Sequence, residues 1–138
     1  MDNSPRNVLL VEDDIVDVMA VKRLFKRFDM SHKYQLHTAE NGAEAIAMLR
    51  GESGYNQIMP SPRVIFLDLN MPKMNGFEFL ELLRADPDFK QTKVIVLTTS
   101  DAPEDRRKAT TANVAGYIVK PITLSQFVEA ITTLSRFQ

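Results

Sequence analysis

The sequence predicts an α/β protein, a doubly wound parallel sheet in which five strands alternate with five helices. Two observations predict this class. Apolar runs of strand length recur five times along the 138 residues, and each is followed by a segment with helical spacing or a helix-start signal. Four of the runs are continuously apolar, which is typical of strands buried on both faces of a parallel sheet.

The five predicted strands lie at residues 8–11, 34–37, 64–67, 94–97 and 117–119. Most of their residues are β-branched, leucine or aromatic, as strands favour. The second run is partly polar, so it is expected at an edge of the sheet, and the other four are expected to be buried on both faces.

The first helix is predicted over residues 14–29 by an apolar face at helical spacing with basic residues opposite. The apolar face consists of Val18, Val21, Leu24, Phe25 and Phe28, and the basic face of Lys22, Arg23, Lys26 and Arg27.

Three further helix starts are marked by a capping residue that precedes a Glu or Gln by three positions. The pairs are Asn41 with Glu44, Asn75 with Glu78, and Thr123 with Gln126. The fourth helix is expected to begin near Pro103, with acidic residues in its first turn. Its apolar face is thin, which predicts the most loosely held helix, and consists of Ala109, Ala112 and Val114.

Right-handed crossovers between these elements give a (βα)5 protein in the flavodoxin-like strand order 2-1-3-4-5. The longest connection, residues 51–63, is rich in Gly, Ser and Pro and is predicted to be a surface loop.

Length and composition indicate a single domain over residues 1–138, with no overall charge to attract polyanions. Seventeen basic residues against eighteen acidic ones give a net charge of −1, so neither nucleic acid nor a membrane is expected as a partner. The absence of cysteine fits a reducing cytoplasm, and no apolar run reaches the ~18 residues of a spanning helix. The expected location is cytoplasmic.

Candidate chemistry lies at the carboxyl ends of the strands, where sites form in this fold class. Glu12 and Asp13 follow the first strand and Asp68 the third, and these strands are neighbours in the predicted order. Taken singly, such residues are commonly helix caps or solvated loop residues. Together, their crowded carboxylates need a cation, for which Mg²⁺ is the natural candidate, and Lys120 can supply a second positive charge.

A carboxylate beside Mg²⁺ and a lysine suits phosphoryl transfer with Asp as nucleophile. The chain has neither a P-loop nor a dinucleotide-binding glycine motif. The acidic residues after the first strand would repel a flavin phosphate. Its two histidines, His32 and His37, are predicted to be solvated surface residues.

Four motifs in combination resemble the receiver domain of two-component response regulators. They are VEDD at 11–14, DLNMPKMNG at 68–76, LTT at 97–99 and GYIVKP at 116–121. The resemblance covers nearly the whole chain, about residues 7–137.

The resemblance implies that Asp68 accepts the phosphoryl group. It implies that Asp13 binds Mg²⁺ directly, that Glu12 does so through water, and that Asp68 and the backbone carbonyl of Asn70 are further ligands. Asp14 falls outside this set and is expected to cap the first helix.

The resemblance further implies that Thr98 is a switch hydroxyl on a phosphoryl oxygen and that Lys120 is the ammonium on the phosphate. Tyr117 would be the aromatic residue whose ring turns inward when Thr98 moves, and a static strand residue is the alternative. The Lys120-Pro121 bond is cis in relatives.

More narrowly, the chain is similar to small single-domain regulators paired with bacterial phytochrome kinases. This implies a light-sensing histidine kinase as donor, an unidentified downstream protein, and a homodimer through the fourth helix, fifth strand and fifth helix. The chain would catalyse only its own phosphorylation and dephosphorylation.

One rival is a phosphorylation-independent interaction module on the same fold. The other is a phosphatase of the haloacid dehalogenase type, although such enzymes carry the nucleophile after the first strand.

Overall fold

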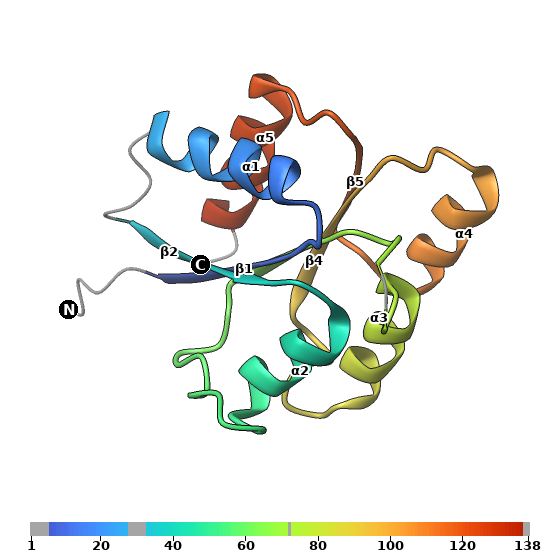
Figure 1. Cartoon of the computed structure of the whole chain (residues 1–138). Coiled ribbons are helices and arrows are strands. Elements are labelled where there is room, and N and C mark those ends of the chain that lie inside the picture. Colours follow the sequence, from blue (N-terminus) through green and yellow to red (C-terminus); the bar gives the residue numbers. More distant parts are fainter. Residues whose placement is uncertain (1–5, 28–32, 72, 137–138) are drawn as a thin grey trace.

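The computed structural model in Figure 1 describes residues 6–27, 33–71 and 73–136. Its parallel sheet has the order β2-β1-β3-β4-β5, which confirms the predicted fold class and strand order. The strands are β1 (Arg6–Val11), β2 (Tyr34–Ala39), β3 (Val64–Leu67), β4 (Lys93–Thr98) and β5 (Gly116–Val119). The helices are α1 (Ile15–Arg27), α2 (Gly42–Arg50), α3 (Gly76–Ala85), α4 (Pro103–Thr111) and α5 (Leu124–Arg136).

Helices cover both faces of the sheet, and each face has its own core. Figure 1 shows α1 and α5 together on one face and α2 and α3 on the other. Successive strand residues point to opposite faces, so Val8 and Leu10 join the core under α1 and α5 while Leu9 and Val11 join the other. The ring centroids of Phe25 and Phe127 lie 5.4 Å apart in an edge-on contact that ties α1 to α5.

Three of the four continuously apolar strands are buried as predicted, but the prediction for β5 is wrong. In β5 only Ile118 is buried, and Gly116, Tyr117 and Val119 are half-buried. The reason is its place at the second edge of the sheet, beside β4 alone. The partly polar β2 occupies the first edge, as predicted.

The predicted helix starts are confirmed by hydrogen bonds. Asn75 and Glu78 form a reciprocal capping box at α3, and Thr123 and Gln126 exchange the same two bonds at α5. The Asn41 side chain accepts from the Glu44 amide at α2. There the Glu44 carboxylate reaches past Asn41 to the Glu40 amide, at 2.7 Å.

Helix α1 has its predicted apolar face, with Val18, Val21 and Phe25 buried. Phe28 and His32, two residues of the sequence predictions, lie outside the described residues. The Asp14 carboxylate accepts from the Val16 amide at 2.8 Å and caps α1 as expected.

Helix α4 begins at Pro103 as predicted, but its predicted apolar face is wrong in extent. Ala109 is its single buried residue, because the helix ends at Thr111 and both Ala112 and Val114 follow it. The Arg84 guanidinium of α3 holds this end by donating to the Ala112 carbonyl at 2.9 Å.

The loop 51–63 joins α2 to β3 as predicted, and its Ile58 is buried. The Asn7 side chain of β1 ties this loop to the sheet. It donates to the Pro60 carbonyl at 2.7 Å, and its amide oxygen lies 2.9 Å from His37 Nε2. His37 is therefore half-buried and hydrogen-bonded, and its prediction as a solvated residue is wrong.

The Met59-Pro60 and Lys120-Pro121 bonds are both cis. Within the described part of the chain, no helix is long and apolar enough to cross a membrane.

Candidate functional site

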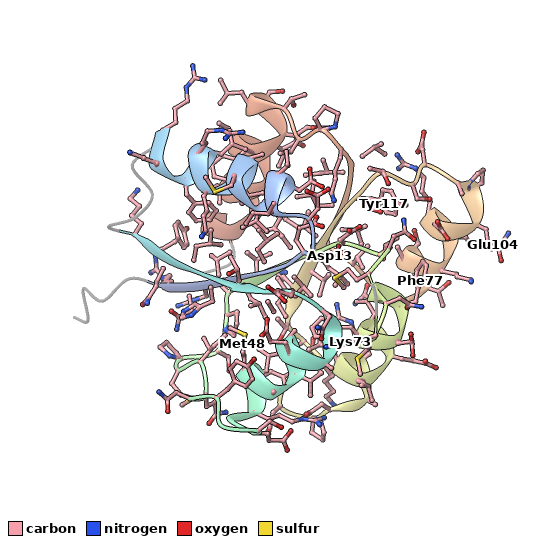
Figure 2. All side chains as sticks on the ribbon, in the orientation of Figure 1. Asp13, Met48, Lys73, Phe77, Glu104 and Tyr117 are labelled. Atoms are coloured by element: carbon pink, nitrogen blue, oxygen red, sulfur yellow. The ribbon has the colours of Figure 1, made fainter. Side chains whose placement is uncertain are left out.

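The carboxyl ends of β1 and β3 bring three carboxylates together. Val11 pairs with Leu67 in the sheet register, so Glu12 and Asp13 follow one strand where Asp68 follows its neighbour. One carboxylate oxygen from each of the three acids lies within 4.8 Å of the others. Glu12 and Asp68 are buried and Asp13 is exposed, and Figure 2 shows where Asp13 lies in the fold. The predicted crowding is confirmed.

Lys120 follows β5 and reaches across the strand ends into this cluster. Its Nζ donates to Glu12 Oε1 at 2.5 Å and to Asp17 Oδ2 at 2.8 Å, and lies 3.5 Å from Asp68 Oδ2. Burial lowers the pKa of Lys120, but the hydrogen bonds to Asp17 and Glu12 and the charge of Asp68 outweigh burial and hold it above its ordinary value. The lysine is therefore a fixed positive charge beside Asp68.

Even with Lys120 in place, the cluster is short of positive charge. Burial raises the pKa of Glu12 to about 7, and the Asp68 charge adds to this, although hydrogen bonds from Lys120 and the Asp14 amide act against it. The Lys120 ammonium contacts the carboxylates of Glu12, Asp17 and Asp68, and Asp13 adds a fourth negative charge to the cluster. Hard oxygen donors and unbalanced negative charge are what Mg²⁺ requires, so the residues present fit this ion.

The backbone after β3 sets the position of the Asp68 side chain. The Asn70 amide donates to Asp68 Oδ1 at 3.2 Å, and Lys120 faces the other oxygen. Gly76, the first residue of α3, packs directly on this segment and donates to the Leu69 carbonyl at 3.0 Å. A glycine is required at this position by close approach, because a Cβ on Gly76 would lie 2.6 Å from the Asp68 carbonyl oxygen.

Thr98 and Tyr117 lie on the neighbouring strands β4 and β5. Thr98 is fully buried, and its Oγ1 accepts a long hydrogen bond of 3.4 Å from the Ser100 amide. The Tyr117 hydroxyl donates to the Ser100 carbonyl at 2.8 Å. Both side chains therefore contact the same residue at the start of the β4–α4 connection.

Sequence reasoning missed Asp17, which lies in the first turn of α1. Its carboxylate holds Lys120 more closely than Asp68 does. The available signal was only its place in the first turn of α1, shortly after the acidic residues that follow β1.

Most of the chain matches a protein-family model. Residues 8–132 match the response regulator receiver domain. The chain belongs to the response regulator receiver family.

Other receiver proteins match this chain over nearly its full length. Response regulator Rcp1 of Synechocystis is 33% identical over 98% of this chain and 90% of its own length. A two-component response regulator from Legionella pneumophila has a similar structure, with a TM-score of 0.85 and 34% identity over 95% of this receiver and 98% of that chain.

Two similar structures are those of a phosphorylated regulator and of a metal-bound regulator. One is the phosphorylated cyanobacterial phytochrome response regulator RcpA, with a TM-score of 0.80 and 32% identity over 96% of this chain and 93% of that one. The other is the Mn²⁺-bound form of Rcp1, with a TM-score of 0.79 and 32% identity over 96% and 94% of the two chains. The receiver described here is thus a two-component signalling protein with phytochrome-linked relatives.

Proposed function

We propose that the chain accepts a phosphoryl group on Asp68 from the phosphohistidine of a sensor histidine kinase, in a Mg²⁺-dependent reaction. The observation that carries this proposal is the setting of Asp68, a buried carboxylate with Lys120 at 3.5 Å and the oxygens of Glu12 and Asp13 within 4.8 Å. In the proposed step an Asp68 oxygen attacks phosphorus, the P–N bond to the donor imidazole breaks, and the imidazole keeps the electron pair.

Glu12, Asp13, Asp68 and the backbone carbonyl of Asn70 would hold the metal ion. When bound there, Mg²⁺ neutralises negative charge on the carboxylates and on the transferring group. The Mn²⁺-bound form of the related Rcp1 supports a divalent cation in such a chain.

Lys120 would bind a phosphoryl oxygen with the same ammonium that faces Asp68. Its contacts with Glu12 and Asp17 orient that ammonium before the phosphoryl group arrives. Thr98 would donate its hydroxyl to another phosphoryl oxygen, and Tyr117 would follow it through the shared Ser100. The added charge would thereby bias the position of α4.

The direct test is intact-protein mass after incubation with a small phosphodonor. The wild type should gain one phosphoryl group only when Mg²⁺ is present, and Asp68→Asn should gain none. Asp88→Asn, which removes an exposed aspartate after α3, is the matched control and should label like the wild type. Equal labelling of Asp68→Asn would overturn the assignment. Partner affinity that does not change with phosphodonor would favour the interaction module instead, and turnover of phosphate esters beyond one equivalent would favour the phosphatase.

We further propose a phytochrome-type histidine kinase as the donor, supported by the likeness to RcpA. A donor protein must pass the start of α1, where Ile15, Val16 and Met19 are exposed beside the acidic cluster. Phosphotransfer from a phytochrome kinase should be faster than from a histidine kinase without a phytochrome module. Val16→Glu should slow transfer from the kinase more than labelling by the small donor. Equal rates from both kinases would overturn this pairing.

We also propose that residues 1–138 act as one receiver domain, with its core at about residues 7–137, and that it forms a homodimer through α4, β5 and α5. Leu124 and Val128 support the dimer, since both are more than 40% exposed and lie one turn apart on α5. Val128→Glu should shift size-exclusion elution to the monomer position. Unchanged elution for both the variant and the phosphorylated protein would reject the dimer.

A further inference from the structure

The Tyr117 ring is held by an exposed arginine of α4. The Arg106 guanidinium carbon lies 4.6 Å from the centre of the ring, a distance at which a cation is attracted to an aromatic face. Arg106 Nε donates to Asp101 Oδ1 at 2.7 Å, which fixes the guanidinium from the side of the β4–α4 connection. Tyr117 thus contacts α4 through a charged side chain, and it also packs against the apolar cluster of Leu69, Val96 and Ala109.

The same connection is braced by a second set of bonds. The Ser100 hydroxyl donates to Asp105 Oδ2 at 2.5 Å and accepts from the Ala102 amide at 3.3 Å. Since the Tyr117 hydroxyl also donates to the Ser100 carbonyl, the ring is held at its hydroxyl by the connection and at its face by α4. Figure 2 shows Tyr117 beside β5 and facing α4.

The N-terminal half of α4 is fixed by the bond between Asp105 and Ser100 and by the contacts of Arg106. Ala109 is its single buried residue, and the Arg84 contact holds the far end. The contact between Arg106 and Tyr117 is therefore a principal link between the first turns of α4 and the sheet.

We propose that Arg106 is a positioning residue that holds the Tyr117 ring and transmits a change at Asp68 and Thr98 to α4. The transmitted change rests on the proposed phosphoryl acceptance at Asp68, whereas the hold on the ring does not. Arg106 touches neither Asp68 nor the carboxylate cluster in the contacts described, so its effect is exerted through Tyr117.

The hold on the ring is tested in the unmodified protein by NMR with ring-labelled tyrosine. The chain has three tyrosines, so the Tyr117 signal is assigned as the one that Tyr117→Phe removes. Arg106→Ala should shift this signal. It should also lower the population of the held ring, relative to the ring turned away from α4, about two- to fivefold, the size expected for one exposed cation–π contact. Arg106→Lys, which keeps a cation over the ring, should restore most of the wild-type signal. Arg107→Ala is the matched control, one exposed arginine further along α4, and should leave the signal in place.

Transmission is tested with beryllofluoride and Mg²⁺, a stable mimic of the phosphoryl group. In the wild type the amides of Thr98, Ser100 and α4 should all shift. In Arg106→Ala the Thr98 and Ser100 shifts should persist while the α4 shifts fall at least about twofold. A Tyr117 signal unchanged by Arg106→Ala, or α4 shifts equal to those of the wild type, would overturn the proposal. Absence of any shift in the wild type would instead count against phosphoryl acceptance at Asp68 and against the transmission, and the tyrosine measurement would still decide the hold on the ring.

Discussion

Gly76 lies so close to Asp68 that a Cβ atom on the glycine would come within 2.6 Å of the Asp68 carbonyl oxygen and 2.7 Å of the Leu69 Cα. The first turn of α3 is thereby packed directly on the backbone that carries the proposed phosphoacceptor. Both near atoms belong to the backbone, so a side chain here cannot be relieved by rotating a neighbour.

Gly76→Ala should therefore displace the segment after β3. We expect a loss of about 1–3 kcal/mol in the free energy of unfolding, the usual cost of overpacking, measured by urea denaturation. Phosphodonor labelling of Asp68 should slow by roughly ten- to a hundredfold, because the nucleophile moves.

Gly116→Ala is the matched control for this glycine. A Cβ there would meet Ile95 at 3.6 Å, an ordinary contact distance. Its stability should stay within about 0.5 kcal/mol of the wild type. If Gly76→Ala behaved like Gly116→Ala in both assays, the close approach of Gly76 to Asp68 would affect neither the stability of the fold nor the labelling of Asp68.

Asp17→Asn should weaken Mg²⁺ binding without removing a proposed ligand. The variant removes one negative charge from the group around Lys120, and a divalent cation nearby should lose about fivefold in affinity, measured by titration calorimetry at low salt. Glu104→Gln removes a charge from the exposed side of α4 (Figure 2) and should bind Mg²⁺ like the wild type. Equal affinities for the two variants would contradict the role given to Asp17.

Thr98→Val should separate labelling from switching. The side chain keeps its volume in a fully buried position, so stability should change by only about 1 kcal/mol. Asp68 should still accept a phosphoryl group, but the Tyr117 NMR signal should respond less to it, because the hydroxyl next to Ser100 is gone. Thr98→Ser, which keeps the hydroxyl, should respond as the wild type does. A full Tyr117 response in Thr98→Val would remove Thr98 from the proposed switch.

His37 should make the fold less stable in acid. Burial lowers the pKa of His37 below its ordinary value of 6.5, so the unfolded chain binds a proton there more readily than the folded chain does. The contribution of His37 is fully present above about pH 6.5 and is lost as the pH falls from there through the lower pKa of the folded state. In urea denaturation between pH 8 and pH 5, the wild type should lose more stability than His37→Gln, whose amide can still donate to Asn7. Parallel profiles of stability against pH for the two proteins would show that His37 has the same pKa in the folded and the unfolded chain.

Most of the fold was predictable because its determinants are local. The alternation of apolar runs and helix starts led to the observed strand order, and the capping residues at Asn75 and Thr123 form the bonds that their spacing indicates. The errors arose where burial depends on distant neighbours. The run at 117–119 is apolar enough for the interior, yet β5 has a strand on one side only. His37 reads as a surface residue until Asn7 is placed beside it.

The acidic cluster was also predictable, since the fold class places the ends of β1 and β3 side by side. The sequence by itself determined the strand and helix pattern, which follows from local spacing. It also predicted the meeting of Glu12, Asp13 and Asp68, because the flavodoxin-like order of such a chain places the first and third strands side by side and parallel strands end at one edge. Only the tertiary structure decided that Asp17 shares Lys120, that Gly76 packs on Asp68 and that Arg106 covers Tyr117. These contacts join residues of different elements, and the way those elements pack against one another is set only in three dimensions.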